Sequence, residues 1–486
     1  MSVEQEAPPT QRGGGLFGKA VLLLSGNAAS SLLSLVRNLL IARLIPVEDY
    51  GVAATFAAAM SFVEMLSAFG LQQQVIQSKQ QDTKWQSALQ GFQFARAVLS
   101  ALVLFFSAGL IADFMGVPEV AWAYQVLAIA PLLNGLVHLD IYRLNRSMRY
   151  GPMILTMTVP VLISLIAVWP LYMMFGDYRV MLYAILIQMG LMMVISILTA
   201  ERALRLSLDR SVIGQVVRFG WPLLINNILI FVVLNGEKIV VGRELGMAVL
   251  GIFAMGFTLT LTPTMVLAKS VQSFFLPQLS KLQDDDVRFQ PLARATIEAN
   301  FFNGALLVVG VVLLGEIFVT LALGDKYAAL VPLMVWLAIL QAMRVFKAGG
   351  AVVSLARAKT ENAMVANSFR VLSLPLSWWA AVETGDLLLV IWIATAGEMC
   401  GVIASLVLTR WRAGVALARL WPVVGCVLAL LITAALFAAH GDIAALAGVP
   451  RWTLAALCVA LLGLCGWTMR DTKAYLSSRK RKTQAA

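Results

Sequence analysis

Charged and metal-binding side chains are scarce in this chain. Of its 486 residues only 13% are Asp, Glu, Lys or Arg, and there are two histidines and four cysteines. The two histidines are too few and too peripheral in the predicted spans to form a metal centre. No pair of cysteines has CxxC or metal-ligand spacing, so we interpret them as buried thiols: Cys400, Cys426, Cys458 and Cys465. The sequence therefore predicts no metal and no cofactor.

Sequence motifs of the common membrane-associated enzymes are also missing. There is no G-x-x-x-x-G-K-[ST] motif, which argues against ATP hydrolysis by this chain, no Rossmann glycine motif and no HExxH. No predicted outer loop is long enough to hold paired carboxylates, which argues against a membrane glycosyltransferase or polymerase. We therefore expect a protein that is not an enzyme.

Apolar residues are abundant instead. They make up 60% of the chain, and the mean hydropathy is +0.83. The apolar runs are continuous rather than alternating, which predicts an all-α integral membrane protein and not a β-barrel. Pro, Gly and charged residues separate about fourteen predicted transmembrane helices, near 17–41, 50–74, 87–111, 120–142, 152–175, 178–200, 213–235, 247–272, 295–322, 328–354, 362–382, 387–409, 418–439 and 451–469.

Basic residues are distributed unevenly among the predicted loops. If the N-terminus lies inside, roughly 25 Lys and Arg residues fall in inner segments and about six in outer loops, as the positive-inside rule requires. This pattern predicts that both termini are cytoplasmic. The polar segment at 1–15 shows no small-residue cleavage site before the first span, so we expect that span to be retained rather than cleaved as a signal peptide. The net charge of +11 is explained by these loops, so no nucleic-acid partner is expected. The basic C-terminal tail is interpreted as a stop-transfer anchor that contacts anionic membrane lipids.

A helical hairpin at 26–77 recurs two hundred positions later. The two stretches match at one offset, without a gap, and this favours an internal duplication; the matching pairs are Asn27 and Asn227, Arg43 and Arg243, Gly51 and Gly251, Ala54 and Ala254, and Gln72 and Gln272. Six predicted spans separate the copies, so the repeat is of the parallel type. We predict two pseudo-symmetric six-helix bundles at 1–200 and 213–410, a cytoplasmic linker at 201–212, and two extra helices with a basic tail at 411–486.

Six basic residues lie within predicted spans, where a charge costs roughly 3 kcal/mol or more. Lys269 and Lys347 lie near the inner boundary, and we expect them to snorkel to the interface. Snorkelling and a cavity-facing role are equally good explanations for Arg37. For the remaining three we favour positions facing an internal cavity that would suit an anion such as pyrophosphate; they are Arg96, Arg344 and Arg370.

Each of four other polar residues within the predicted spans has two alternative roles. Glu64 and Glu398 either form buried salt bridges with the arginines or couple transport to a proton or cation gradient. Asn27 and Asn227 either line the cavity or hydrogen-bond to a neighbouring helix. The residues alone leave these alternatives open.

Short motifs in the hairpin and in the eighth span resemble a known family. The sequence Ile41-Ala42-Arg43-Leu44, followed by Pro46, Asp49-Tyr50-Gly51 and Gly70-Leu71, resembles the opening of Wzx-type polysaccharide flippases of the multidrug/oligosaccharidyl-lipid/polysaccharide exporter superfamily. Leu276-Pro277-Gln278-Leu279-Ser280-Lys281 resembles the end of span eight in the same superfamily, which includes lipid II flippases. The resemblance covers roughly the first 410 residues and implies two bundles around a central cationic cavity.

The resemblance also implies a cargo of undecaprenyl-pyrophosphate-linked oligosaccharide, moved to the outer leaflet of a bacterial inner membrane. Arg37 matches a cavity arginine of lipid II flippases, whereas Glu64 and Thr258 stand where those relatives have two others. An O-antigen, capsule or exopolysaccharide repeat unit is therefore a better expectation than lipid II. Polysaccharide polymerase and glycosyltransferases are the expected protein partners.

The sequence thus predicts a flippase that works by alternating access. Arg37, Arg96, Arg344 and Arg370, with Asn27 and Asn227, would bind the substrate, and Glu64 and Glu398 are candidate ion-coupling residues of an antiporter. The main alternative is a multidrug exporter of the same superfamily, although a cationic drug would need an acidic or aromatic cavity. A membrane enzyme or an assembly scaffold for a glycan complex is a third alternative, and the sequence shows neither a catalytic constellation nor a large soluble surface for it.

Overall fold

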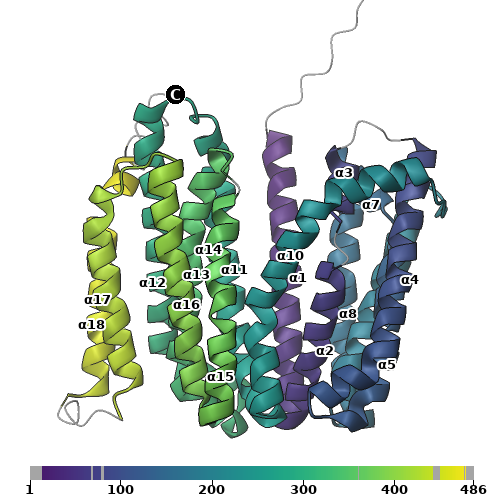
Figure 1. Cartoon of the computed structure of the whole chain (residues 1–486), viewed down its shortest axis with the longest axis horizontal. Coiled ribbons are helices and arrows are strands. Elements are labelled where there is room, and N and C mark those ends of the chain that lie inside the picture. Colours follow the sequence, from purple (N-terminus) through teal and green to yellow (C-terminus); the bar gives the residue numbers. More distant parts are fainter. Residues whose placement is uncertain are drawn as a thin grey trace, which may run out of the picture. The chain divides into compact units, whose positions relative to one another are not determined.

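The computed structural model of the chain (Figure 1) describes residues 14–66, 69–77, 82–359, 361–441, 449–475 and 477, and among these it contains helices and no strand. The all-α prediction is confirmed. The main helices of the first half are α1 (Gly14–Leu44), α2 (Val47–Leu66), α3 (Leu71–Gln77), α4 (Thr83–Phe114), α5 (Ala121–Leu127), α6 (Ile129–Gly135), α7 (Asp140–Arg146), α8 (Gly151–Phe175) and α9 (Arg179–Leu198). Those of the second half are α10 (Arg210–Glu244), α11 (Met247–Ser280), α12 (Asp286–Leu323), α13 (Val331–Ala356), α14 (Glu361–Leu372), α15 (Leu374–Thr384), α16 (Leu387–Arg412), α17 (Trp421–Ala438) and α18 (Arg451–Thr468). Three short 3₁₀ helices, η1 (Pro118–Val120), η2 (Asp325–Leu330) and η3 (Ala418–Leu420), lie between them.

Packing divides the chain into two units. The first contains Met1–Asn38, Ser67–Gly109 and Ala121–Leu224, and the second contains Leu39–Leu66, Leu110–Val120 and Ile225–Ala486. The chain passes from one unit to the other within α1, α4 and α10. Because α2 packs on α11, it belongs to the second unit. This division follows contacts rather than the repeat, so the predicted six-helix bundles stay a prediction.

Membrane crossing is supported by helix length and composition. Within the described residues nine helices are long and apolar enough to span a bilayer, and a tenth candidate is the bent pair Pro118–Gly135 and Asp140–Arg146. The protein is therefore a multi-pass membrane protein. The exact number of fourteen spans stays a prediction.

Three of the predicted spans are not single helices. The span expected at 120–142 bends by 45° where α6 ends and α7 begins. The span expected at 50–74 is divided between α2 and α3, and the span at 362–382 between α14 and α15. Pro375 explains the last break, because proline has no N–H to donate to the carbonyl of Val371 four residues earlier and its ring clashes with that carbonyl.

The break between α6 and α7 is filled by side chains from α4 and α9. Gln90 and Gln93 donate hydrogen bonds to the carbonyls of Gly135 and Val137 at 3.1–3.3 Å. The Gln90 Oε1 atom accepts from the backbone N–H of Leu139 at 3.0 Å. Non-helical backbone is tolerated in a membrane segment only where protein or water satisfies its polar groups. The glutamines of α4 therefore make this bend possible.

The C-terminal helices match the two extra spans expected near 418–439 and 451–469, and they pack on one another and on α12 (yellow in Figure 1). The chain beyond them is fastened to the same helix. Arg294 of α12 forms a buried ion pair with Asp471 at 2.6 Å, and Glu298 accepts hydrogen bonds from the backbone and side chain of Thr472 at 2.9 and 2.8 Å. Tyr475 bonds to Gln278 of α11. We call residues 469–475 the C-terminal strap.

Candidate functional site

A cluster of buried charges lies among α13, α14 and α16 in the second unit. Glu398 of α16 is 0% exposed. Its carboxylate accepts hydrogen bonds from the Nε of Arg344 at 2.8 Å and the Nζ of Lys347 at 2.7 Å, and the Nε of Arg370 lies 3.3 Å away. One carboxylate is thus shared by three cations. Glu398 therefore does form buried salt bridges with the arginines, and the expectation that Lys347 snorkels to the interface is wrong.

A second carboxylate joins the cluster from α10. Glu237 is 1% exposed and forms an ion pair with Arg370, which is 0% exposed and also donates to Ser373 at 2.9 Å. Lys238, the residue after Glu237, places its Nζ 4.8 Å from the ring centre of Phe257 on α11. The Cζ of Arg344 lies 5.1 Å from the same ring. Both contacts are within the range of cation–π attraction.

Helix geometry explains how these residues meet. Arg344 and Lys347 are three residues apart and so lie on one face of α13. Glycines of α16 let α14 approach closely, because a Cβ atom at Gly401 would lie 2.9 Å from the carbonyl oxygen of Ala366. Arg370 lies one turn beyond Ala366 and is thereby held beside Glu398.

Positive charge is in excess in this cluster. It contains four cations and two carboxylates, and no ion pair to Lys238 is found within the described part of the chain. A buried charge is costly unless it is paired and hydrogen-bonded. An anionic ligand with two negative charges would neutralise the cluster, which makes it a candidate anion site.

The first unit holds the other predicted arginines. Arg37 is 7% exposed and donates to Ser164 of α8 at 3.1 Å and to Gln188 of α9. Arg96 is half-buried on α4. The structure therefore brings Arg344 and Arg370 together with Glu398, but it places Arg37 and Arg96 in the unit that lacks this cluster.

The remaining predicted residues are scattered. Glu64 is exposed on α2, and Asn227 is half-buried within α10, a helix that it does not interrupt. Asn27 is helical, and its side chain lies outside the described residues. The predicted span at 213–235 ends before Glu237 and Lys238 and so leaves both in an outer loop, whereas α10 continues to Glu244. The signal that could have placed them is the apolar run at 239–241, which continues the helix beyond the polar residues.

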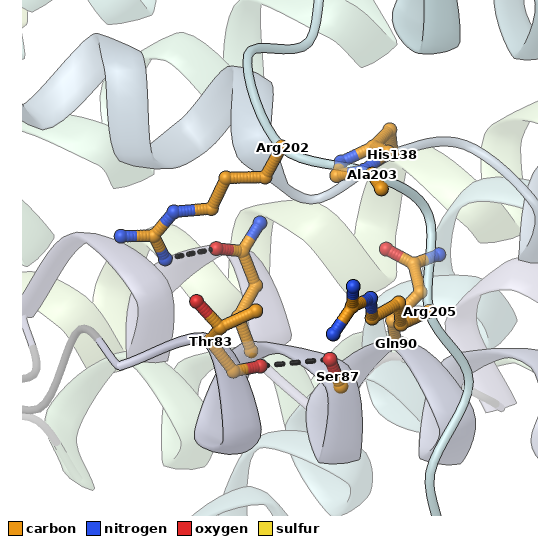
Figure 2. Close-up of a pocket in the computed structure, with 8 residues that line it drawn as sticks. Thr83, Ser87, Gln90, His138, Arg202, Ala203 and Arg205 are labelled. Atoms are coloured by element: carbon orange, nitrogen blue, oxygen red, sulfur yellow. Dashed lines mark hydrogen bonds between the residues drawn. The ribbon is translucent and has the colours of Figure 1, made fainter.

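A small polar pocket lies next to the bend in the first unit (Figure 2). Its volume is about 10 Å³, enough for about one water molecule, and Thr83, Gln90, His138 and Arg205 are among the residues around it. Arg202 donates to Gln86 at 2.6 Å beside it. The pocket is too small for an organic ligand, so we interpret it as part of the support for the bend.

The chain is similar in sequence to proteins of polysaccharide biosynthesis. A family model described as "Polysaccharide biosynthesis protein" matches residues 40–332. The teichuronic acid biosynthesis protein TuaB of Bacillus subtilis (strain 168) is 28% identical over 167 residues, covering 33% of this chain and 33% of TuaB. The lipopolysaccharide biosynthesis protein WzxC of Escherichia coli (strain K12) is 23% identical over 348 residues, covering 67% of this chain and 66% of WzxC. The chain thus aligns with about a third of one relative and about two thirds of the other.

Solved structures share the fold. The lipid II flippase MurJ in an inward closed conformation superposes with a TM-score of 0.69 at 14% identity, over 92% of this chain and 98% of that one. An inward-facing multidrug resistance MATE family transporter of the MOP superfamily superposes with a TM-score of 0.66 at 14% identity, over 79% and 94%. At this identity the likeness concerns the fold alone.

Proposed function

The chain belongs to the polysaccharide biosynthesis protein family, and on that basis we propose that it is a flippase for lipid-linked oligosaccharides. The cargo is a repeat unit of an O-antigen, capsule or exopolysaccharide carried on undecaprenyl pyrophosphate. The membrane is the bacterial inner membrane, with both chain termini in the cytoplasm. Polymerase and glycosyltransferases are the proposed protein partners, and the chain itself catalyses no covalent step.

The buried cluster around Glu398 is the observation that supports this proposal best. A pyrophosphate that links a lipid to a sugar carries two negative charges, and the cluster has two positive charges in excess. The sugar hydroxyls and the pyrophosphate cannot cross hydrocarbon without losing their hydrogen bonds to water. Arg344 and Lys238 beside Phe257 would replace part of that hydration and neutralise the headgroup.

The proposed mechanism is alternating access between two helical bundles. Arg37 and Arg96 are proposed to contribute further positive charge from the first unit, and Asn27 and Asn227 hydrogen bonds to the sugars. An ion gradient resets the cycle, with Glu64 and Glu398 as candidate coupling residues. The net positive cluster is a poor match for a cationic drug, which weighs against a multidrug exporter.

The test measures surface polysaccharide in a deletion strain complemented with variants. We expect Lys238→Met to reduce surface polysaccharide at least tenfold while the protein level in the membrane stays normal. Lys269→Met is the matched control, because this exposed lysine of α11 is not part of the cluster, and it should leave polysaccharide unchanged. If the deletion strain had normal surface polysaccharide and increased drug susceptibility, the flippase proposal would be wrong and the multidrug exporter would be the better assignment.

A further inference from the structure

The two arginines that recur at one offset make equivalent contacts in the second unit. Arg43, in the last turn of α1, donates from one Nη atom to the carbonyls of Leu321 and Ala322, the latter at 3.0 Å. Arg243, in the last turn of α10, donates from one Nη atom to the carbonyls of Asp113 and Phe114 at 3.2 and 2.7 Å. Each arginine therefore binds two consecutive carbonyl groups.

The carbonyl groups that the two arginines contact lie at the same kind of place, the C-terminal end of a helix. Asp113 and Phe114 end α4, and Leu321 and Ala322 lie in the last turn of α12. Asp113 and Leu321 each precede by three residues a glycine with positive φ, Gly116 at 73° and Gly324 at 80°. The last carbonyls of a helix have no partner within the helix and attract cations. Arg43 of the first hairpin thus caps α12, which follows the second hairpin in the sequence. Arg243 of the second hairpin caps α4, which follows the first.

The glycines of the two hairpins form a third matched contact. A Cβ atom at Gly51 would lie 1.9 Å from the carbonyl oxygen of Met247, and one at Gly251 would lie 2.1 Å from the carbonyl oxygen of Val47. Gly51 lies four residues after Val47, which Gly251 contacts. Gly251 in turn lies four residues after Met247, which Gly51 contacts. α2 and α11 therefore cross in backbone contact near their first turns, in an arrangement that is reciprocal between the two copies.

We infer that these residues form a reciprocal latch, which holds the outer ends of the two repeats together in one state of the transport cycle and is released in the other. We use reciprocal latch for Arg43, Gly51, Arg243 and Gly251 with the carbonyls that they contact. The assignment of this end to the outside rests on the charge pattern, and the cycle rests on the proposed function.

The strength of the latch suits a reversible contact. Both arginines are exposed, and a hydrogen bond that water can replace contributes little net free energy. Two such caps can hold a closed state without preventing its opening. Lys326 strengthens one side, because it donates to the carbonyl of Ile45 at 2.6 Å.

The test measures how fast a membrane-impermeant maleimide labels a buried position near the crossing. Thr55 lies one turn after Gly51 on α2 and is 6% exposed. The Thr55→Cys substitution would be made in the full chain after its four cysteines are replaced by alanine, and labelling followed in right-side-out vesicles. We expect Arg43→Ala and Arg243→Ala each to raise the labelling rate roughly three- to tenfold, and the double variant to raise it further. Arg43→Lys, which keeps a donor, should have a smaller effect.

Arg179→Ala is the matched control for charge. Arg179 also lies at a predicted outer end, but it bonds locally to Asp177 at 2.9 Å, so its removal should leave labelling unchanged. Gly51→Ala and Gly251→Ala should raise labelling, whereas Gly310→Ala on α12 should not, because a Cβ atom there meets nothing within 4 Å.

An unchanged labelling rate in the double arginine variant would overturn the latch. The latch would also be overturned if only one of the two arginine substitutions changed the labelling rate. The same holds if size-exclusion chromatography showed that both single variants fail to fold. Labelling needs no cargo, so this outcome is independent of whether the polysaccharide test supports the flippase.

Discussion

The two units bury their polar side chains by different means. In the first unit, glutamines of α4 satisfy the bend between α6 and α7, Arg37 bonds to a serine and a glutamine, and a carboxylate at the bend, Asp140, pairs with Arg143. In the second unit, Glu237 and Glu398 are shared by arginines and a lysine. A bend whose backbone groups are satisfied by neutral side chains needs no ligand, whereas a cluster with excess charge can still respond to an ion or a ligand. We therefore interpret the glutamines of the first unit as support for its bend, and the charged cluster of the second unit as the anion site of the proposed function.

The largest expected effect comes from removing one partner of a charged pair. Arg370→Met would leave Glu237 without its ion-pair partner and should destabilise the protein by about 3–5 kcal/mol, because a carboxylate would stay buried and unpaired. Thermal unfolding in detergent measures this change. The double variant Arg370→Met/Glu237→Met should recover much of the loss. Equal stability of the single and double variants would contradict the pairing.

A smaller effect is expected in the neutral network. Gln90→Leu removes two bonds to backbone carbonyls and one from the Leu139 N–H, which should cost about 1–3 kcal/mol. Amide hydrogen exchange at 135–140 should become faster. Ser107→Ala on the same helix is the control, since its hydroxyl bonds only within the helix, to Val103 and Leu104. If Gln90→Leu left exchange unchanged, the bend would not depend on this side chain.

The smallest effect is expected outside the membrane, where the first unit does use ion pairs. Hydrogen bonds from Arg143 and Arg149 lower the pKa of Glu201 below its usual 4.5. Because the folded pKa is depressed, the stability from this carboxylate is present above about pH 4.5 and is lost as the pH falls through the folded pKa. We expect the melting temperature of Glu201→Gln to depend less on pH below about 4.5 than that of the parent. The same pH dependence in both proteins would show that these bonds contribute nothing.

Sequence reasoning reached the helices, the two C-terminal spans and part of the charged cluster. Arg344, Arg370 and Glu398 are recognisable because each interrupts an apolar run, and opposite charges at such positions attract. Glu237 and Lys238 were missed because Asn235 and Gly236 before them resemble a loop. Which helices meet is a property of tertiary packing, so partners such as the Glu237–Arg370 pair do not follow from spacing along the chain.

The bend in the first unit was missed for a similar reason. Residues 136–139 include three apolar residues and carry no proline, so the sequence predicts one continuous span there. The informative signal lies elsewhere in the chain: Gln86, Gln90 and Gln93 form a polar stripe on one face of an apolar helix. Such a stripe predicts that some backbone nearby needs hydrogen-bond partners, but it does not say which segment.

The C-terminal strap has a practical consequence for anyone who shortens or tags this protein. A truncation after α18 would leave Arg294 and Glu298, both buried on α12, without the groups that Asp471 and Thr472 supply. An affinity tag added beyond residue 477 keeps those contacts. Purification yields from the two designs should therefore differ, and the shorter protein is the one expected to aggregate.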